Sequence, residues 1–199
     1  MILNSIFPVA VATFNLGRDY TPEENAFVDS QETHKNKGNT TSDDRYVLKN
    51  DVFANLKVAI EKNVNQYFHA IYAPKHEVNL RITQSWLNYC KPGEWHHKHA
   101  HPNSFISGVL YMKAERERDK IYFYKDGYKQ INLPTNNYNL YNSESWWFPV
   151  GAGDMVIFPS SLTHSVEPVQ GERVSLSFNT FPVGYVGEED TLTALYLEH

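Results

Sequence analysis

Hydrophobic positions alternate with polar ones from Val78 onward, in short segments separated by proline and glycine. These segments read LRITQSWLNYC, SFISGVLYM, KIYFYKD, SWWFPV, DMVIFPS and RVSLSFNTF. Six or more short strands in succession are typical of an antiparallel barrel or a jelly roll. Within KIYFYKD the alternation of Tyr122, Phe123 and Tyr124 predicts one buried face and one exposed face.

The N-terminal third follows a helical spacing after a first predicted strand in MILNSIFPVAVATFNLG. Thr21 is an N-cap candidate, Pro22 suits the first helical position, and Glu24 stands three residues after the cap, which predicts a short helix to about Ser30. The polar stretch 31–44 is expected to be an exposed loop.

A long amphipathic helix is predicted over 51–72, ended by Pro74 and covering one face of the sheet. The apolar positions that define it are Phe53, Leu56, Ile60, Val64, Tyr67, Phe68 and Ile71.

The predicted fold is mainly β with N-terminal helices: a double-stranded β-helix (a jelly roll, cupin-like) supported by α-helices. A chain of 199 residues is long enough for one core, so we expect a single domain over 1–199. Its N-terminal strand and supporting helices would occupy 1–77, the jelly-roll core 78–185, and a C-terminal tail 186–199.

Charge and composition exclude several classes of protein. Eighteen Lys and Arg against 23 Asp and Glu give a net charge of -5, which leaves no broad basic footprint for nucleic acid. No apolar run approaches the length of a membrane span, and no basic leader precedes the first apolar stretch. The single cysteine, Cys90, excludes an internal disulfide and fits a reducing compartment. We therefore expect a cytoplasmic protein.

Three of the nine histidines are proposed metal ligands, and two more, His96 and His97, are close neighbours of them in the sequence. His99 and His101 are two residues apart, so on a strand both rings point to one side and can reach one ion. His164 follows FPSSLT, where a proline turn would place it at a strand start, and it is the candidate third ligand. His97 shares a face with His99 and is a competing ligand. The alternative is that these histidines are surface residues or hydrogen-bonded core residues.

The strand after His164 has two chemically different faces. One face is polar and consists of Arg173, Ser175, Ser177 and Asn179. The other face is apolar and consists of Val174, Leu176 and Phe178. The polar face suits a cavity for a charged ligand, in which Arg173 pairs with a carboxylate and Ser175 adds a hydrogen bond. The alternative is that this face points to solvent.

The stretches HAHPNSFISGVLYM and GDMVIFPSSLTHSVEPVQGERVSLSFN resemble the iron(II)- and 2-oxoglutarate-dependent oxygenases. The likeness is to an uncharacterised branch found in bacteria and their viruses, and more distantly to prolyl hydroxylases. It implies His99, His101 and His164 as catalytic iron ligands, with Arg173 and Ser175 binding 2-oxoglutarate. If a virus encodes the chain, the expected location is the host cytoplasm.

Tyr111, in GVLYM, resembles the tyrosine with which prolyl hydroxylases share the 2-oxoglutarate carboxylate. Asn88 and Trp86 lie on one predicted strand, with Ile82 and Gln84 on the same side, and are candidates for lining the cavity. Asn88 is accordingly included among the candidate cofactor-binding residues. The aromatic run 146–148 is expected to pack under the N-terminal helix rather than to form a wall at the mouth of the cavity.

The resemblance implies an oxidoreductase that uses Fe(II), 2-oxoglutarate and O2. It would couple oxidative decarboxylation of 2-oxoglutarate to succinate with hydroxylation of an unidentified small-molecule or peptidyl substrate. The chain departs from the wider family at His101, where a carboxylate is usual. We therefore expect a three-histidine centre, or a two-histidine centre with His101 turned away. Three neutral imidazoles leave the ion at +2, so 2-oxoglutarate should strengthen iron binding.

Two other functions remain open from the sequence. One is a cupin-type three-histidine metal enzyme that binds its substrate directly and does not use 2-oxoglutarate. The other is a non-catalytic jelly-roll binding protein or a structural viral protein. Formation of succinate separates the first from the oxygenase, and the second predicts no bound iron.

Overall fold

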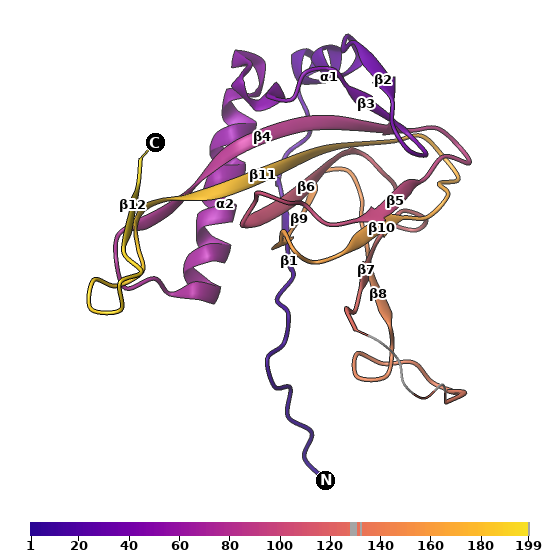
Figure 1. The fold of residues 1–199 in the computed structure, drawn as a ribbon. Coiled ribbons are helices and arrows are strands. Elements are labelled where there is room, and N and C mark those ends of the chain that lie inside the picture. The colour runs from indigo at the N-terminus through magenta and orange to yellow at the C-terminus, as the bar shows by residue number, and fades with distance from the viewer. Residues whose placement is uncertain (128–130, 132, 199) are drawn as a thin grey trace.

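Two antiparallel sheets make up the centre of the protein in the computed structural model, which describes residues 1–127, 131 and 133–198 (Figure 1). Within these residues the larger sheet has the strands β1 (Ala12–Asn15), β2 (Thr33–Lys35), β3 (Thr40–Ser42), β4 (Val78–Cys90), β6 (Ile106–Lys113), β9 (Asp154–Pro159), β11 (Arg173–Val186) and β12 (Leu195–Leu197). The smaller sheet has β5 (His96–His99), β7 (Lys120–Tyr124), β8 (Ser145–Pro149) and β10 (His164–Val166). The predicted mainly β jelly roll is confirmed.

Helices cover one face of the larger sheet (Figure 1). The helices are α1 (Pro22–Asp29), α2 (Ala54–Tyr72) and the short 3-10 turns η1 (Val47–Lys49) and η2 (Asp51–Phe53). The capping box predicted at α1 is present, because Thr21 Oγ1 accepts from the Glu24 N–H and Glu24 accepts from the Thr21 N–H. Ala73 ends α2 in a left-handed conformation, one residue before Pro74.

The apolar stripe of α2 packs on strands β4, β6, β9 and β11 to form the main core. Its buried members are Leu56, Ile60, Val64, Tyr67 and Phe68. On β11 the apolar side chains Leu176 and Phe178 belong to this core. The opposite face of β11 therefore points away from the helices, toward the space between the two sheets.

A second, smaller apolar cluster joins the two sheets. It contains Val109 and Tyr111 of β6, Ile121 and Phe123 of β7, and Phe158 of β9. The alternation predicted for KIYFYKD is confirmed, since Ile121 and Phe123 are buried while their strand neighbours are half-buried. The interior between the sheets is thus partly apolar and partly polar.

The expectation of an exposed loop over 31–44 is wrong, because β2 and β3 form a hairpin that extends the larger sheet along β4. The residues of β2 are exposed, but Thr41 and Ser42 of β3 are buried and bond to the β4 backbone: Thr41 donates to the Leu87 carbonyl, and the Leu87 N–H donates to Ser42 Oγ. In the turn, Gly38 has a φ of +93°, and a Cβ there would lie 2.7 Å from the Trp95 ring, so glycine is required.

The aromatic run 146–148 does not pack under a helix, and that expectation is also wrong. It belongs to β8, an edge strand of the smaller sheet, on the side of the molecule away from α2 (Figure 1). Trp146 and Trp147 are 37% and 44% exposed, and Phe148 alone packs against the cluster between the sheets.

The chain termini also differ in detail from the sequence prediction. The first strand occupies only Ala12–Asn15, and β12 pairs with β11 inside the stretch expected to be a tail, whose last residue, 199, lies outside the described residues. In the part of the chain that the structure describes, no helix is long and apolar enough to cross a membrane.

Candidate metal centre and anion pocket

Three histidine rings converge between the sheets. His99 ends β5 and pairs in register with His164 at the start of β10, while His101 lies in the turn that follows β5. The ring centroids are 4.4 Å apart for His99 and His164, 5.1 Å for His99 and His101, and 5.0 Å for His101 and His164. One ligand nitrogen from each ring lies within 4.8 Å of the others.

His101 is turned toward the other two rings rather than away from them. Its Nε2 lies 3.2 Å from the Nε2 of His99. Two imidazole nitrogens that bind one metal at about 2.1 Å and at right angles lie ~3 Å apart. The arrangement therefore fits shared coordination of one ion by these two rings.

The other nitrogen of each ring is held by an oxygen that can only accept a hydrogen bond. His99 Nδ1 donates to the His97 carbonyl at 2.7 Å, and His164 Nδ1 donates to the Leu162 carbonyl at 3.0 Å. His101 Nδ1 donates to Asn179 Oδ1 at 2.6 Å. Because each proton is on Nδ1, the lone pair of each Nε2 is free for a metal.

Burial keeps the three rings neutral. It lowers the pKa of His99 to about 4, lowers the pKa of His101, and holds the pKa of His164 well below its usual value. Neutral imidazole is the form that binds metals. Within the described residues this cluster contains no carboxylate, so a bound divalent ion would keep its full +2 charge.

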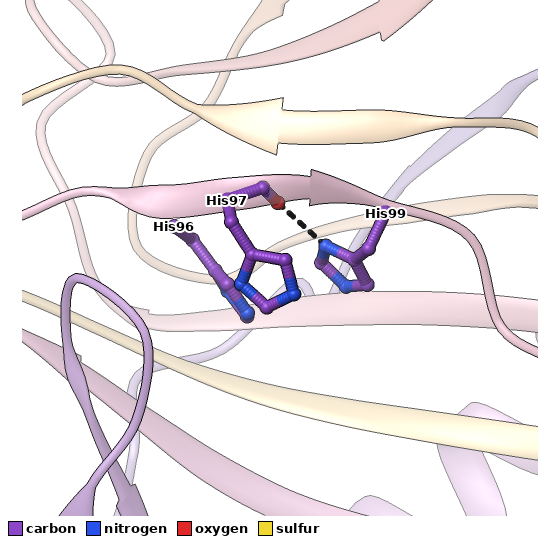
Figure 2. A group of neighbouring side chains, drawn as sticks. All are labelled: His96, His97 and His99. Atoms are coloured by element: carbon purple, nitrogen blue, oxygen red, sulfur yellow. Dashed lines mark hydrogen bonds between the residues drawn. The ribbon is translucent and has the colours of Figure 1, made fainter.

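A second set of histidines shares His99 with the first. Figure 2 shows His96, His97 and His99 side by side along β5, with the His97 carbonyl oxygen bonded to His99 Nδ1. Their ligand atoms also lie within 4.8 Å of one another, but all three side chains are only half-buried. His97 Nδ1 is buried without a hydrogen-bond partner in the described part of the chain, so nothing there fixes its tautomer.

A candidate anion-binding site, called the anion pocket below and formed by the buried side chains of Arg173 and Tyr111, lies at the other end of the polar face of β11. Arg173 is 3% exposed, donates from Nη1 to the Lys120 carbonyl at 2.8 Å, and lies 4.9 Å from the centre of the Tyr111 ring. No ion pair among the described residues involves Arg173. A buried guanidinium without a counter-charge is costly, which favours an anionic ligand beside it.

The Tyr111 hydroxyl is a second candidate donor beside Arg173. It is buried and has no hydrogen-bond partner in the described part of the chain. Burial raises its pKa to about 12, with Arg173 acting in the opposite direction, so the hydroxyl keeps its proton. A buried guanidinium next to an unpaired hydroxyl donor fits a carboxylate.

Ser175 and Asn88 lie between the anion pocket and the histidines. Ser175 is buried, and its backbone is in register with Asn88 of β4 on one side and with Tyr111 of β6 on the other. The Asn88 amide donates to Ser177 Oγ at 3.0 Å and accepts from Asn39 at 3.4 Å. The amide of Asn88 is therefore already engaged within the protein, while the polar face of β11 is buried rather than solvent-facing.

A cavity of about 570 Å³ opens onto the histidines. Trp86 lines it and lies 5.7 Å from the His101 ring, so its expected place at the cavity is confirmed. Two lining residues, His34 and Arg45, were not foreseen because they lie in or beside a stretch whose polarity predicted a loop. The role of Asn179 beside His101 was also missed, although its position on the polar face of β11 was the available signal.

Part of the chain that carries these residues is similar to a known protein family. Residues 84–179 match the model of a family described as "Putative 2OG-Fe(II) oxygenase". No curated protein gave a significant match.

Similar solved structures share the fold at low sequence identity. An oxidoreductase of the 2OG-Fe(II) oxygenase family from Burkholderia pseudomallei is 13% identical, with a TM-score of 0.56 over 85% of this chain and 83% of that chain. A prolyl-4-hydroxylase from Pseudomonas putida is 14% identical, with a TM-score of 0.55 over 86% and 92%. HygX from Streptomyces hygroscopicus, crystallised with nickel and 2-oxoglutarate, is 13% identical, with a TM-score of 0.61 over 96% and 92%.

These likenesses confirm the resemblance seen in the sequence. Over residues 84–179 the chain matches the 2OG-Fe(II) oxygenase family, and its fold is the fold of the 2OG-Fe(II) oxygenases.

Proposed function

We propose that this protein is a non-haem iron(II) dioxygenase that uses 2-oxoglutarate and O2 to hydroxylate a small-molecule or peptidyl substrate. The observation that carries the proposal is the convergence of three histidines whose Nδ1 atoms all have hydrogen-bond partners and of which one ligand nitrogen each lies within 4.8 Å of the others. The family match supports it, as do similar folds crystallised with 2-oxoglutarate and nickel or iron.

In this proposal His99, His101 and His164 hold the iron through Nε2. Each ring is oriented by a separate acceptor, two of them backbone carbonyls and one the Asn179 amide. Such fixed acceptors set both the ring orientation and the tautomer, so little rearrangement is needed when the metal binds. The set 99, 101 and 164 is favoured over 96, 97 and 99 because it is more deeply buried and each of its rings has a partner on Nδ1.

Arg173 would pair with the far carboxylate of 2-oxoglutarate, and the Tyr111 hydroxyl would donate a hydrogen bond to the same group. Ser175 would supply a further donor from the buried polar face, and Asn88 would hold this wall in place through Ser177. Because Arg173 and Tyr111 are almost completely buried, the bound carboxylate would be shielded from water, which strengthens the charge pair.

Bound iron with 2-oxoglutarate and O2 supplies oxidative decarboxylation to succinate, coupled to oxidation of a C–H bond. The residues of this chain position the metal, exclude water from the anion pocket, and present the substrate through the cavity lined by Trp86. One similar fold, SnoN from nogalamycin biosynthesis, is described as a non-haem α-ketoglutarate-dependent epimerase, so hydroxylation is the proposed outcome rather than a property of the fold.

A cupin-type enzyme that binds its substrate directly on the metal is the second candidate. The observation that favours it is a cluster built of histidines with no carboxylate in the described residues. In that case Arg173 would bind a carboxylate of the substrate itself, and 2-oxoglutarate would not be consumed.

The test is succinate formation from 2-oxoglutarate by the purified protein supplied with Fe(II) under air. We expect succinate from the wild type and from His97→Ala, and none above background from His101→Ala or His164→Ala. His69→Ala, an exposed histidine on α2, is the matched control and should behave as the wild type. Iron binding without succinate would favour the cupin-type enzyme, and no iron binding would favour a non-catalytic protein.

A further inference from the structure

The cavity above the histidines has an unusual charge pattern. Among the described residues that line it there is one arginine, Arg45, and no Asp, Glu or Lys. The remaining polar lining consists of histidines, side-chain amides and hydroxyl groups. A cavity with a single fixed cation and no carboxylate favours an anionic ligand.

Arg45 is held in place by neutral acceptors. Its Nη2 lies 2.8 Å from His34 Nε2, and its Nη1 donates to Thr41 Oγ1 at 3.3 Å. A guanidinium has only donors, so His34 Nε2 must accept, and the proton of that ring is on Nδ1, which donates to the Asp43 carboxylate. The Asp43 charge is thus one ring away, and no ion pair among the described residues involves Arg45.

The backbone at Arg45 is fixed as well. The Ser85 N–H donates to the Arg45 carbonyl at 2.8 Å, which ties Arg45 to β4 between Gln84 and Trp86, two residues that line the same cavity. The turn of the preceding hairpin is tied to the residue just before β5, because the Trp95 N–H donates to the Gly38 carbonyl at 3.0 Å. Arg45 is therefore a half-buried, oriented cation rather than a mobile surface side chain.

We propose that Arg45 anchors the substrate, and that this substrate carries a carboxylate or a phosphate group. This proposal rests on the proposed function, because the bound anion is a substrate only if the protein is an enzyme. Two of the five N–H donors of the guanidinium are used by Thr41 and His34, and the others are available for an oxyanion. Arg45 and Arg173 then have separate roles, since Arg45 lines the open cavity while Arg173 is buried beside Tyr111.

The test measures binding of small anions without any turnover. Benzoate and phenyl phosphate are titrated into the full chain by calorimetry, with benzamide and phenol as uncharged probes of similar shape, because the flat face of Trp86 lines the same cavity. The variants are Arg45→Gln, which removes the charge and keeps a polar amide, Arg173→Met, and Arg81→Gln. Arg81 is exposed and does not line the cavity, so its variant is the matched control.

We expect at least one anion to bind the wild type and Arg81→Gln alike, and to bind Arg45→Gln at least about tenfold more weakly. Arg173→Met reports whether the anion has bound beside Tyr111 instead. The preferred anion identifies the group as carboxylate or phosphate. Equal binding by wild type and Arg45→Gln would overturn the proposal, as would loss of binding in Arg173→Met alone or equal binding of charged and uncharged probes. An unchanged thermal unfolding temperature of Arg45→Gln would show that the variant keeps the hairpin intact.

This measurement is independent of the oxygenase chemistry. If succinate does not form but anion binding still requires Arg45, the anion site stands and the proposed function fails. If succinate forms but Arg45→Gln binds the anions as the wild type does, the proposed function stands and the anion site fails.

Discussion

The two faces of β11 are both buried, yet they are built for different purposes. The face toward α2 is apolar, with Leu176 and Phe178 inaccessible to solvent in the main core. The face toward the smaller sheet is polar, with Arg173 near one end and Asn179 nearer the other, and both side chains are less than a tenth exposed. The two faces are equally buried, but the apolar face stabilises the fold and the polar face carries the candidate ligand-binding residues.

The polar face of β11 is not a badly packed part of the hydrophobic core. Asn179 accepts from His101 and from Ser107, so its oxygen is satisfied. In the described part of the chain, Arg173 bonds to the Lys120 carbonyl but has no anionic partner, and the Tyr111 hydroxyl has no hydrogen-bond partner. Satisfied polar groups orient the candidate metal ligands, and unsatisfied ones mark where a ligand would bind.

The largest expected effect is on the apolar face. Phe178→Ala should lower the free energy of unfolding by about 3–5 kcal/mol, because it removes a fully buried ring that packs over Gly108. Urea denaturation measures it. A loss below about 1 kcal/mol would show that the face toward α2 does not dominate the stability of β11.

On the polar face, Arg173→Met should separate stability from binding. The affinity for 2-oxoglutarate should fall about 30-fold or more, because a buried charge partner is lost. The free energy of unfolding should stay within about 1 kcal/mol of the wild type or rise, since a buried cation without a counter-charge is removed. Calorimetry and urea denaturation on one preparation measure both, and a large loss of stability with unchanged 2-oxoglutarate binding would contradict the assignment.

Asn179→Ala tests the other end of the same face. The affinity for the metal should fall about 10- to 100-fold, because His101 loses the closer of its two Nδ1 partners and keeps only the Ser107 hydroxyl, at 3.1 Å, which can donate as well as accept. Gln84→Ala is the control, since Gln84 lines the cavity and contacts Asn179 but not the histidines. If both variants bind the metal as the wild type does, Asn179 does not position His101.

A smaller effect is expected from the coupling between iron binding at the histidines and 2-oxoglutarate binding at Arg173. Fe(II) on three neutral imidazoles keeps its +2 charge, so the 2-oxoglutarate dianion should increase the affinity for iron by about tenfold. Anaerobic titration of iron with and without 2-oxoglutarate measures the coupling. Equal affinities would indicate that the charge of the histidine centre is balanced in another way.

The sequence alone predicts most of the difference between the two faces of β11. The alternation along 173–179 separated the two faces correctly, and the spacing of α2 identified the helix that covers the apolar one. These predictions succeeded because period and burial are local properties of one strand or one helix.

The parts that were missed depend on contacts between distant segments. The hairpin of β2 and β3 reads as a loop, because its sequence is polar throughout and the burial of Thr41 and Ser42 comes from pairing with the distant strand β4. The hydrophobicity of the aromatic run of β8 predicts that it packs under a helix, and this is wrong because hydrophobicity does not indicate which sheet an edge strand joins. The Asn179 contact with His101 spans 78 residues of sequence, and no local pattern marks it.

The most direct test of the central claim is the absorption of the protein mixed anaerobically with Fe(II) and 2-oxoglutarate. The account predicts a charge-transfer band that requires both components, is present in the wild type and in His97→Ala, and is absent in His164→Ala. A wild-type protein that binds one equivalent of iron and 2-oxoglutarate without such a band, or a band that survives in His164→Ala, would contradict it.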